Sequence, residues 1–300
     1  MKQLSEINID KVFKNIEFDW LGLTAEEYKG KKVLTFLNDI KYLKEVEQNK
    51  TIVGIITTEE VAKELLNRSY GILVVDNPKK EFFLLHNKLA QKEFYLKKSE
   101  NKISSKAIIS EKSNIGKNNI VIEDNVIIED NVTIYPNVTI KSGSIIKSGT
   151  VLGADGFQYS KFGEEIIKVE SIGELIIEEN VIIQNNCVID KGVFDKTIIG
   201  KNSKIYNLVH VAHDSKIGEN TLITAGVIIC GRVKVGKNSY LGPNCTVKNG
   251  LTLGANSRVS MGAVVTKNVG DNETVTGNFA ISHSKFLKLF KYLLKLIGEE

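Results

Sequence analysis

The sequence from Ile199 to Val265 reads IGKNSKIYNLVHVAHDSKIGENTLITAGVIICGRVKVGKNSYLGPNCTVKNGLTLGANSRVSMGAVV. An aliphatic residue occupies every sixth position, 12 times in succession: Ile199, Ile205, Val211, Ile217, Ile223, Ile229, Val235, Leu241, Val247, Leu253, Val259 and Val265. A period of six fits neither an α-helix nor an amphipathic strand, whose periods are about 3.6 and about 2 residues. It is typical of a hexapeptide β-helix, in which three hexads form one triangular coil of about 18 residues.

The same spacing begins well before this stretch and is interrupted twice. It runs through Ile103, Ile109 and Ile115, slips by one residue, continues from Ile122 to Leu152, and returns from Ile177 to Ile189. Residues 153–171 form a long insertion, and 190–198 add four residues to the period. A solenoid accommodates extra residues at its corners, where such loops commonly shape a binding face. We therefore expect a mainly β architecture, with a parallel β-helix over residues 101–277.

Residues 1–100 have a different pattern, typical of a small mixed α/β domain. The predicted elements are buried strands at 51–56 and 71–75, a helix after the N-cap Thr58, a turn at 76–78 and a second helix over 81–96. The last helix carries His86 among apolar residues, so we expect that histidine to be structural.

The C-terminal segment, residues 278–300, abandons the hexad and predicts a basic amphipathic helix. Six apolar residues follow helical spacing, with four lysines between them: Phe286, Leu289, Phe290, Leu293, Leu294 and Ile297, with Lys285, Lys288, Lys291 and Lys295. Two interpretations remain open for the apolar face. It packs against the end of the β-helix or a neighbouring chain, or it contacts a carrier protein or a membrane surface.

The composition narrows the class of protein. The chain has 300 residues, of which 42% are hydrophobic and 25% charged, as in a folded globular protein. Its net charge of +4 is too small and dispersed to indicate a nucleic-acid partner. No apolar run approaches the length of about 18 residues needed to span a membrane, and the N-terminus lacks the apolar core of a secretory signal. Three cysteines without CxxC spacing favour neither a disulfide framework nor a zinc knuckle, so we expect a cytoplasmic protein.

Histidine is the side chain best suited to move a proton near neutral pH, and the chain has four: His86, His210, His213 and His283. His213 is the third residue of its hexad, a corner position from which we expect it to point outward. A catalytic base is the favoured interpretation, with a structural role as the alternative. A zinc site is disfavoured, because no Cys, Asp or Glu cluster at ligand spacing accompanies His210 and His213.

Both interruptions of the hexad hold residues with functional potential. The first contains Phe157 and Tyr159, which predict a loop that contacts substrate or one that packs on itself. The second contains Asp190 and Asp195, which orient a substrate or merely form the turn.

These segments together resemble one family, the UDP-3-O-acylglucosamine N-acyltransferases (LpxD) of lipid A synthesis. The matching stretches are GADGFQYS (153–160), IDKGVFDKTIIG (189–200) and VHVAHDSKIGENTLITAGVIICG (209–231), with weaker matches in LTFLNDIKYL (34–43) and DNPKK (76–80). The hexads alone would indicate only the wider hexapeptide acyltransferase superfamily. The Ala-His-Asp segment followed by Ile-Gly-Glu-Asn-Thr is the more specific match.

The resemblance implies a left-handed β-helix, a homotrimer with active sites between subunits, and no permanently bound cofactor. The reaction it implies is transfer of an acyl group from a phosphopantetheine thioester, on acyl carrier protein or coenzyme A, to the amine of a nucleotide-linked sugar. His213 matches the general base. Substrate binding would involve the uracil-stacking pair Phe36 and Tyr42 together with other residues: Asn38, Phe157, Tyr159, Asn207 and His210. From coil stacking we add the backbone N–H of Gly231, one coil further on, as an oxyanion donor.

The chain departs from the family in places. Asn38 lies one position early, with Asp39 in the family's place, and Gly250 replaces a second histidine. Tyr206-Asn207-Leu208 replaces Asp-Asn-Gln, which leaves no acid assigned to orient His213, and His210 replaces a common glutamine. Two enzymatic versions therefore stay open: the lipid A enzyme, and a coenzyme A-dependent N-acyltransferase of a UDP- or dTDP-amino sugar for a surface polysaccharide. Two less favoured alternatives are a non-catalytic solenoid scaffold and a different hexapeptide enzyme that binds a metal ion.

Overall fold

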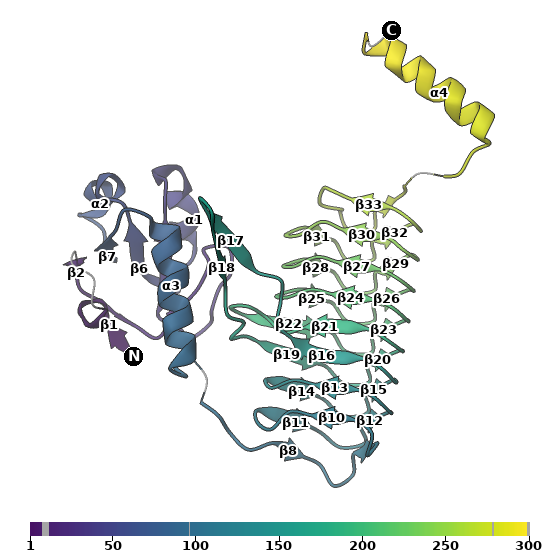
Figure 1. The fold of residues 1–300 in the computed structure, drawn as a ribbon, viewed down its shortest axis with the longest axis horizontal. Helices are drawn as coiled ribbons and strands as arrows, with labels where there is room; N and C mark the ends of the chain where they lie inside the picture. The colour runs from purple at the N-terminus through teal and green to yellow at the C-terminus, as the bar shows by residue number, and fades with distance from the viewer. Residues whose placement is uncertain (8–11, 96, 278, 299–300) are drawn as a thin grey trace.

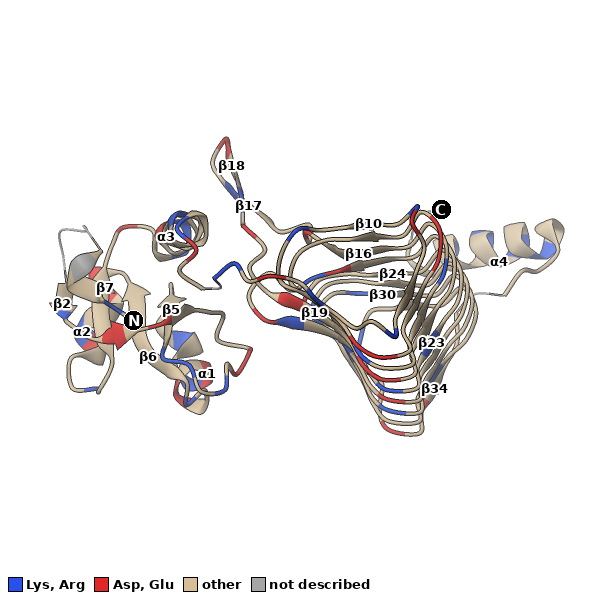
Figure 2. Ribbon diagram, turned by 90° about the horizontal axis from the view of Figure 1, so that it is seen from below, with Lys and Arg blue, Asp and Glu red and all other residues tan. Residues whose placement is uncertain are grey.

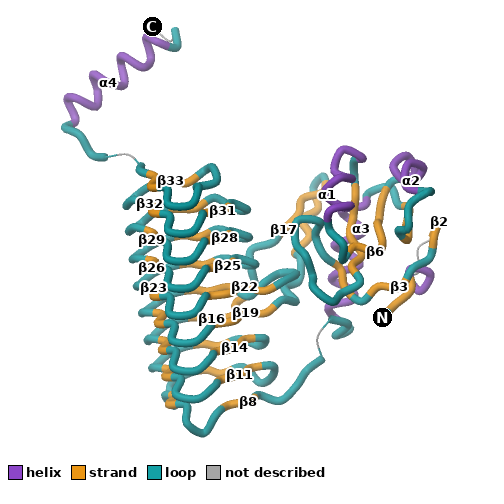
Figure 3. Tube along the Cα trace, turned by 180° about the vertical axis from the view of Figure 1, so that it is seen from behind, coloured by secondary structure: helices purple, strands orange, loops and turns teal. Residues whose placement is uncertain are grey.

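The structure is a computed structural model that describes residues 1–7, 12–95, 97–277 and 279–298. Figure 1 shows three bodies: an N-terminal α/β domain, a stacked β-helix beside it, and a helix at the C-terminal end. The view from behind in Figure 3 shows the same arrangement, with the β-helix coils stacked one upon another.

Three parallel sheets form the walls of the β-helix, because each strand pairs with the strand about one coil away. The first sheet contains β8 (Lys102–Ile103), β11 (Ile120–Ile122), β14 (Val138–Ile140), β19 (Glu174–Ile177), β22 (Lys196–Ile199), β25 (Lys216–Ile217), β28 (Lys234–Val235) and β31 (Thr252–Leu253). The second contains β9 (Ile108–Ile109), β12 (Ile127–Ile128), β15 (Ile145–Ile146), β20 (Ile182–Ile183), β23 (Lys204–Ile205), β26 (Leu222–Ile223), β29 (Tyr240–Leu241), β32 (Arg258–Val259) and β34 (Thr274–Val275). The third contains β10 (Asn114–Ile115), β13 (Thr133–Ile134), β16 (Val151–Ala154), β21 (Val188–Asp190), β24 (His210–Val211), β27 (Ile228–Ile229), β30 (Thr246–Val247) and β33 (Val264–Val265).

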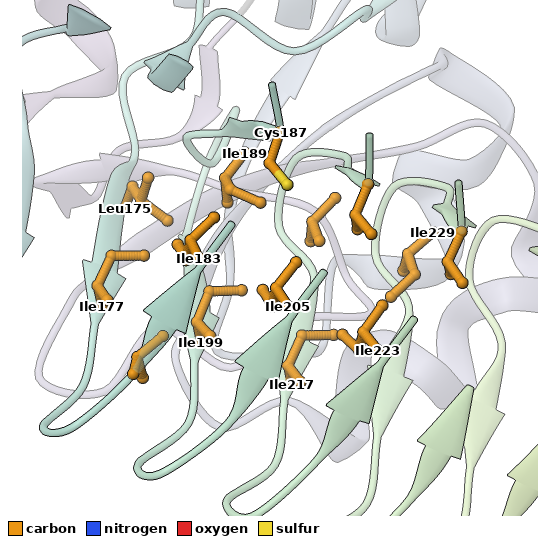
Figure 4. Close-up of a cluster of buried hydrophobic side chains, with 14 of the residues drawn as sticks. Leu175, Ile177, Ile183, Cys187, Ile189, Ile199, Ile205, Ile217, Ile223 and Ile229 are labelled. Atoms are coloured by element: carbon orange, nitrogen blue, oxygen red, sulfur yellow. The ribbon is translucent and has the colours of Figure 1, made fainter. Parts of the chain in front are cut away.

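The hexad aliphatics fill the interior of this coil, as the period predicted. Ile205 pairs in register with Ile223, and Ile223 with Leu241, so side chains 18 residues apart stack directly. All three are at most 1% exposed. Figure 4 shows this apolar column inside the coils. From Ile122 onward every hexad aliphatic is buried, whereas Ile103 in the first coil is 44% exposed. This burial is the driving force that the sequence pattern encodes.

Asparagine at the corners has a separate explanation. Asn202, Asn220, Asn238 and Asn256 all have a positive φ of 56–60°, a conformation that asparagine tolerates better than most residues. Their amides also form a ladder from coil to coil, with Nδ2 of Asn202 donating to Oδ1 of Asn220 at 3.2 Å and the pattern repeating above.

The N-terminal domain is built on a five-stranded sheet in the order β2-β7-β6-β5-β4. Its strands are β2 (Val12–Lys14), β4 (Trp20–Leu21), β5 (Val33–Leu37), β6 (Ile52–Thr57) and β7 (Gly71–Val74), with β1 (Lys2–Gln3) and β3 (Glu17–Phe18) paired separately. The helices are η1 (Leu4–Glu6), η2 (Ile40–Tyr42), α1 (Leu43–Gln48), α2 (Glu59–Leu65) and α3 (Pro78–Gln91). The predicted strands near 51–56 and 71–75 correspond to β6 and β7, and the Thr58 side chain caps α2.

Helix α3 begins and ends earlier than the sequence predicted. The expected turn at 76–78 is the helix N-terminus, because Asn77 Oδ1 accepts a hydrogen bond from Lys80 N–H and Pro78 occupies the first turn. The helix stops at Gln91 instead of residue 96, and Glu93 has a positive φ of 54° that ends it. Residue 96 itself lies outside the described residues.

The two interruptions of the hexad attach the β-helix to the N-terminal domain. The insertion folds back as the hairpin β17 (Tyr159–Phe162) and β18 (Glu165–Lys168), which projects from the body in Figure 2. Val169 and Ile172 of the insertion, with Val193 and Phe194 of the second loop, are buried in the apolar core of the N-terminal domain. The loops thus hold the two domains together.

His86 on α3 completes this junction. Its Nε2–H donates to the carbonyl of Glu170 at 2.9 Å, so its Nδ1 accepts from the hydroxyl of Tyr95, also at 2.9 Å. The ring is fully buried, and burial lowers the pKa of His86 to about 4. The structure therefore holds His86 neutral, in the structural position expected of it.

The buried His86 predicts a loss of stability in acid. The unfolded chain takes up a proton near pH 6.5, whereas the folded chain does so only near pH 4, so stability falls as the pH drops through this window. We expect His86 to contribute a loss of about 3 kcal/mol between pH 7 and pH 4. Urea unfolding at several pH values checks this against His86→Gln, which lacks the titration. Equal pH dependence of the two proteins would contradict the assignment.

The predicted C-terminal helix is present as α4 (His283–Leu296). Packing on the β-helix, one of the two interpretations left open, is not observed among the described residues. The helix stands clear of the coils in Figure 1, and none of its residues is buried. Residues 278 and 299–300 of the expected terminal segment lie outside the described residues. No described helix is long and apolar enough to cross a bilayer.

Candidate active site

His213 lies at the corner that follows β24 and forms a close pair with the next residue. Its Nδ1 is 2.8 Å from Oδ2 of Asp214. Because a carboxylate only accepts hydrogen bonds, Nδ1 carries the proton and Nε2 keeps its lone pair. The lone pair makes Nε2 competent to take a proton from a substrate.

Asp214 supplies the orienting acid that the sequence had left unassigned. Tyr206-Asn207-Leu208 replaces the family's Asp-Asn-Gln, so the sequence predicted no acid to orient His213; the contact with Asp214 corrects that prediction. Asp214 has a positive φ of 58°, which lets its side chain turn back toward the histidine beside it.

The Asp214 carboxylate is buried and accepts several hydrogen bonds. The backbone N–H groups of Val193, Phe194 and Asp195 donate to it at 3.0–3.3 Å, in addition to His213. Burial on its own would raise the pKa of this carboxyl, but these donors, foremost His213, keep the pKa of Asp214 below its ordinary value. The Asp214 carboxylate therefore favours its charged form and holds the Nδ1 side of the His213 ring.

His213 lies outside the aliphatic column, as its corner position predicted, but other residues cover it. It is only 6% exposed, because Gly156 of the insertion closes over it from one side. A Cβ on Gly156 would lie 2.5 Å from Cβ of His213, and a Cβ on Gly231 would lie 2.7 Å from Nε2. The ring is therefore held outside the aliphatic column, between a loop glycine and a corner glycine, where water is largely excluded.

Gly231 has the position expected of it, one coil above His213. The N–H of the next residue, Arg232, donates to the carbonyl of His213 at 2.9 Å, so the two corners are in register. Among the described residues, the Gly231 N–H itself donates to no acceptor. A backbone donor beside Nε2 can stabilise negative charge on a reacting oxygen.

Alanine in place of Gly231 should disturb this arrangement without unfolding the coil. The added methyl group would overlap His213 Nε2 and force the ring to move. Misplacement of a catalytic group by about 1 Å lowers rates by up to about 10²-fold, so we expect turnover to fall by roughly ten- to a hundredfold. Turnover and thermal unfolding measured together check this; normal turnover would show that Gly231 is remote from the reacting atoms.

His210 contacts Asp190 and not Asp214, the partner of His213. The His210 Nε2–H donates to Oδ2 of the buried Asp190 at 3.1 Å, and this hydrogen bond raises the pKa of His210. Its side chain is 44% exposed on the outer face of the third sheet. Asp190 and Asp195 thus contact protein groups, the latter through Lys216 Nζ at 2.5 Å.

The other predicted binding residues lie at separate places. Asn207 Oδ1 accepts from the Asn185 N–H at 3.0 Å, which ties it to the neighbouring coil. Phe157 is 85% exposed and Tyr159 is 45% exposed, with ring centroids 4.8 Å apart at the base of the hairpin. These two rings offer an open apolar surface.

In the N-terminal domain, Phe36 and Tyr42 have unlike surroundings. Phe36 is half-buried against Phe82 and Phe83, with centroids 5.1 and 6.1 Å away. Tyr42 is 46% exposed, with Lys41 Nζ 5.0 Å from its ring centroid. Asn38 lines a hollow of about 1140 Å³ beyond the carboxyl ends of the parallel strands, among six carboxylates: Asp39, Glu59, Glu60, Glu64, Asp76 and Glu81. These carboxylates repel an anionic group such as a diphosphate.

A second hollow, which the sequence did not indicate, lies where the two domains meet. It has a volume of about 500 Å³, with Trp20, Tyr28, Ile172 and Phe194 in its apolar lining and charged residues around them, including Lys196. Its wall includes Phe194 and Asp195, whose backbone N–H groups donate to Asp214. The aromatic residues were visible in the sequence, but nothing local to them indicated this contact. Among the described residues, no group of three or more His, Cys, Asp or Glu is arranged to hold a metal ion.

The comparisons with known proteins agree with the hexads. The model of bacterial transferase hexapeptide (six repeats) matches residues 119–154 and 196–231, and the model of the hexapeptide repeat of succinyl-transferase matches 232–267. UDP-3-O-acylglucosamine N-acyltransferases are similar in sequence. That of Caulobacter sp. (strain K31) is 32% identical over 148 residues, which are 49% of this chain and 44% of the relative. That of Fusobacterium nucleatum is 46% identical over 77 residues, 26% of this chain and 23% of the relative.

The expected resemblance is thus confirmed, although each match covers less than half the length of the relative. Two solved structures support the fold. The UDP-N-acetylglucosamine O-acyltransferase of Moraxella catarrhalis has a TM-score of 0.50 at 20% identity, covering 63% of this chain and 75% of that chain. The acyltransferase of Francisella novicida has the same TM-score at 24% identity, covering 62% and 72%. The left-handed parallel β-helix expected from the resemblance is confirmed.

Proposed function

We propose that this chain is an N-acyltransferase that moves an acyl group from a phosphopantetheine thioester to the amine of a nucleotide-linked sugar. The observation that carries the proposal is the His213–Asp214 pair, whose free Nε2 lies against the corner of Gly231. The similarity to UDP-3-O-acylglucosamine N-acyltransferases supports the lipid A version of this activity.

The proposed reaction assigns a role to His213, Asp214 and the Gly231 N–H. His213 Nε2 removes a proton from the sugar amine as its nitrogen attacks the thioester carbonyl, and Asp214 stabilises the imidazolium that forms. The carbonyl oxygen becomes negative and accepts a hydrogen bond from the Gly231 N–H. The carbon–sulfur bond then breaks, the proton on Nε2 passes to the leaving thiolate, and the amide product remains.

We further propose a homotrimer in the cytoplasm, with acyl carrier protein as the donor and no resident cofactor. The exposed apolar residues on the outer face of the second sheet support self-association. Tyr206 and Leu222 are 52% and 46% exposed there, and with Tyr240 they line a hollow of about 350 Å³. Single apolar residues are common on surfaces, but a contiguous group of exposed apolar residues marks an interaction site.

The test is to incubate the protein with each combination of thioester donor and amino-sugar acceptor and to identify the products by mass spectrometry. The donors are long-chain acyl carrier protein and acetyl and long-chain coenzyme A; the acceptors are UDP- and dTDP-linked amino sugars. An N-acylated product from the carrier-protein donor and a UDP sugar supports the proposal. Product only from coenzyme A donors would favour the surface-polysaccharide version, and no product from any pair would contradict catalysis.

Tyr42→Ala tests the nucleotide site more cleanly than a change at Phe36, because Tyr42 is exposed, whereas Phe36 is half-buried against Phe82. Loss of one stacking ring is expected to raise KM for the nucleotide sugar by about ten-fold, since stacking on a base contributes about 1–3 kcal/mol. Turnover at saturation should change little. An unchanged KM would remove Tyr42 from the binding site; Tyr70→Ala, a partly exposed ring elsewhere in the domain, is the control.

A further inference from the structure

Helix α4 presents an apolar face that nothing in the described chain covers. Phe286, Phe290, Leu293 and Ile297 are each 48–68% exposed. Their spacing of four, three and four residues places them on one side of the helix, where the rings of Phe286 and Phe290 stack with centroids 6.0 Å apart. Such a continuous apolar face in water indicates a partner surface.

The opposite face of α4 is basic. Lys288, Lys291 and Lys295 follow one another at three- and four-residue spacing, and Lys285 lies at the border. Residues 283–298 contain no Asp or Glu. Figure 2 shows the same segment with blue bands and no red.

The width of the apolar face argues against a simple bundle of identical helices. Leu287 and Leu294 extend the face on one flank, and Leu289 and Leu296 extend it on the other, so it covers about half of the helix surface. A helix bundle buries a narrower seam and would leave these flanks in water. Such a bundle would also leave the lysines on its outer side, with no Asp or Glu among residues 283–298 to pair with them. A partner that matches α4 must therefore bury its wide apolar face and carry negative charge next to its lysines.

We propose that α4 lies in the plane of an anionic lipid surface and tethers the enzyme to it. The apolar half would enter the boundary between headgroups and acyl chains, and the lysines would remain among the anionic headgroups. A basic residue near such a surface strengthens binding about fivefold, so the four lysines together contribute several hundredfold. This inference does not depend on the proposed reaction.

Vesicle sedimentation of the full-length protein tests the tether. At low salt the protein should pellet with vesicles of phosphatidylcholine and phosphatidylglycerol, bind vesicles of phosphatidylcholine alone at least tenfold more weakly, and be released as salt screens the headgroups. Lys285→Gln, Lys288→Gln, Lys291→Gln and Lys295→Gln combined should reduce binding to the anionic vesicles by several hundredfold. The matched control makes the same change at four exposed lysines of the β-helix, Lys117, Lys201, Lys237 and Lys267, and should bind normally.

A second variant separates insertion from charge attraction. Phe286→Ser with Phe290→Ser keeps every charge and should leave the fold intact, because none of the described residues of α4 is buried. We expect at least tenfold weaker vesicle binding. Wild-type binding by either α4 variant, or no binding by the unaltered protein, would overturn the proposal. So would α4-dependent binding to acidic acyl carrier protein, or α4-dependent self-association, without vesicle binding. Acyl transfer in solution is measured separately, so loss of one property leaves the other testable.

Discussion

Replacing His213 by alanine is expected to lower turnover by about 10²- to 10⁴-fold, which is the usual contribution of a positioned general base. The physical reason is that a protonated sugar amine has no lone pair with which to attack the thioester. His213 Nε2 is the acceptor placed for that proton, since Nδ1 is committed to Asp214 at 2.8 Å. Steady-state kinetics should show the loss in kcat, with little change in KM for either substrate.

His210→Ala is the matched control for this change. It removes the same kind of side chain three residues away, but that side chain contacts Asp190 and is 44% exposed. We expect the control to keep most of its turnover. His213→Ala also removes one hydrogen bond from the buried Asp214, so a loss of about 1–3 kcal/mol in unfolding free energy is expected, too little to unfold the protein. Full turnover by His213→Ala would exclude it as the base.

The β-helix was predictable because its determinants are local and repeated. Each hexad places its aliphatic inward whatever its neighbours do, and the pairing of Ile199 with Ile217 follows from counting three hexads. The positive φ of the corner asparagines likewise has a local cause, because asparagine tolerates this conformation better than most residues. A repeat constrains the register at every coil, so an error at one position is corrected by the next.

The site was only partly predictable, because its key contacts cross elements. Spacing alone could not show that the 193–195 turn donates to Asp214 or that Gly156 closes over His213. The burial of Phe194 within the N-terminal domain depends on two chain segments that are far apart in sequence. The sequence could have indicated one contact, that of Asp214 with His213, because the two residues are adjacent and Asp214 lies at a corner of the coil.

Asp214→Asn is expected to lower kcat by about 10³-fold while leaving the corner intact, because asparagine also accepts a positive φ. The physical reason is the tautomer of His213. An amide that turns its NH₂ toward Nδ1 donates to that nitrogen, so the ring proton moves to Nε2 and the lone pair needed for catalysis is lost. ¹⁵N spectra of the imidazole should show the proton moving from Nδ1 to Nε2, a change that a purely structural role would not produce.

Asp195→Asn separates this effect from damage to the turn. Asp195 belongs to the 193–195 turn, whose backbone N–H groups donate to Asp214. Its own carboxylate contacts Lys216, and only its backbone N–H reaches Asp214. It should therefore keep the His213 tautomer and most of the turnover, even if the loop is loosened. Equal losses in the two variants, or an unchanged imidazole spectrum in Asp214→Asn, would show that Asp214 supports the loop and does not orient the base.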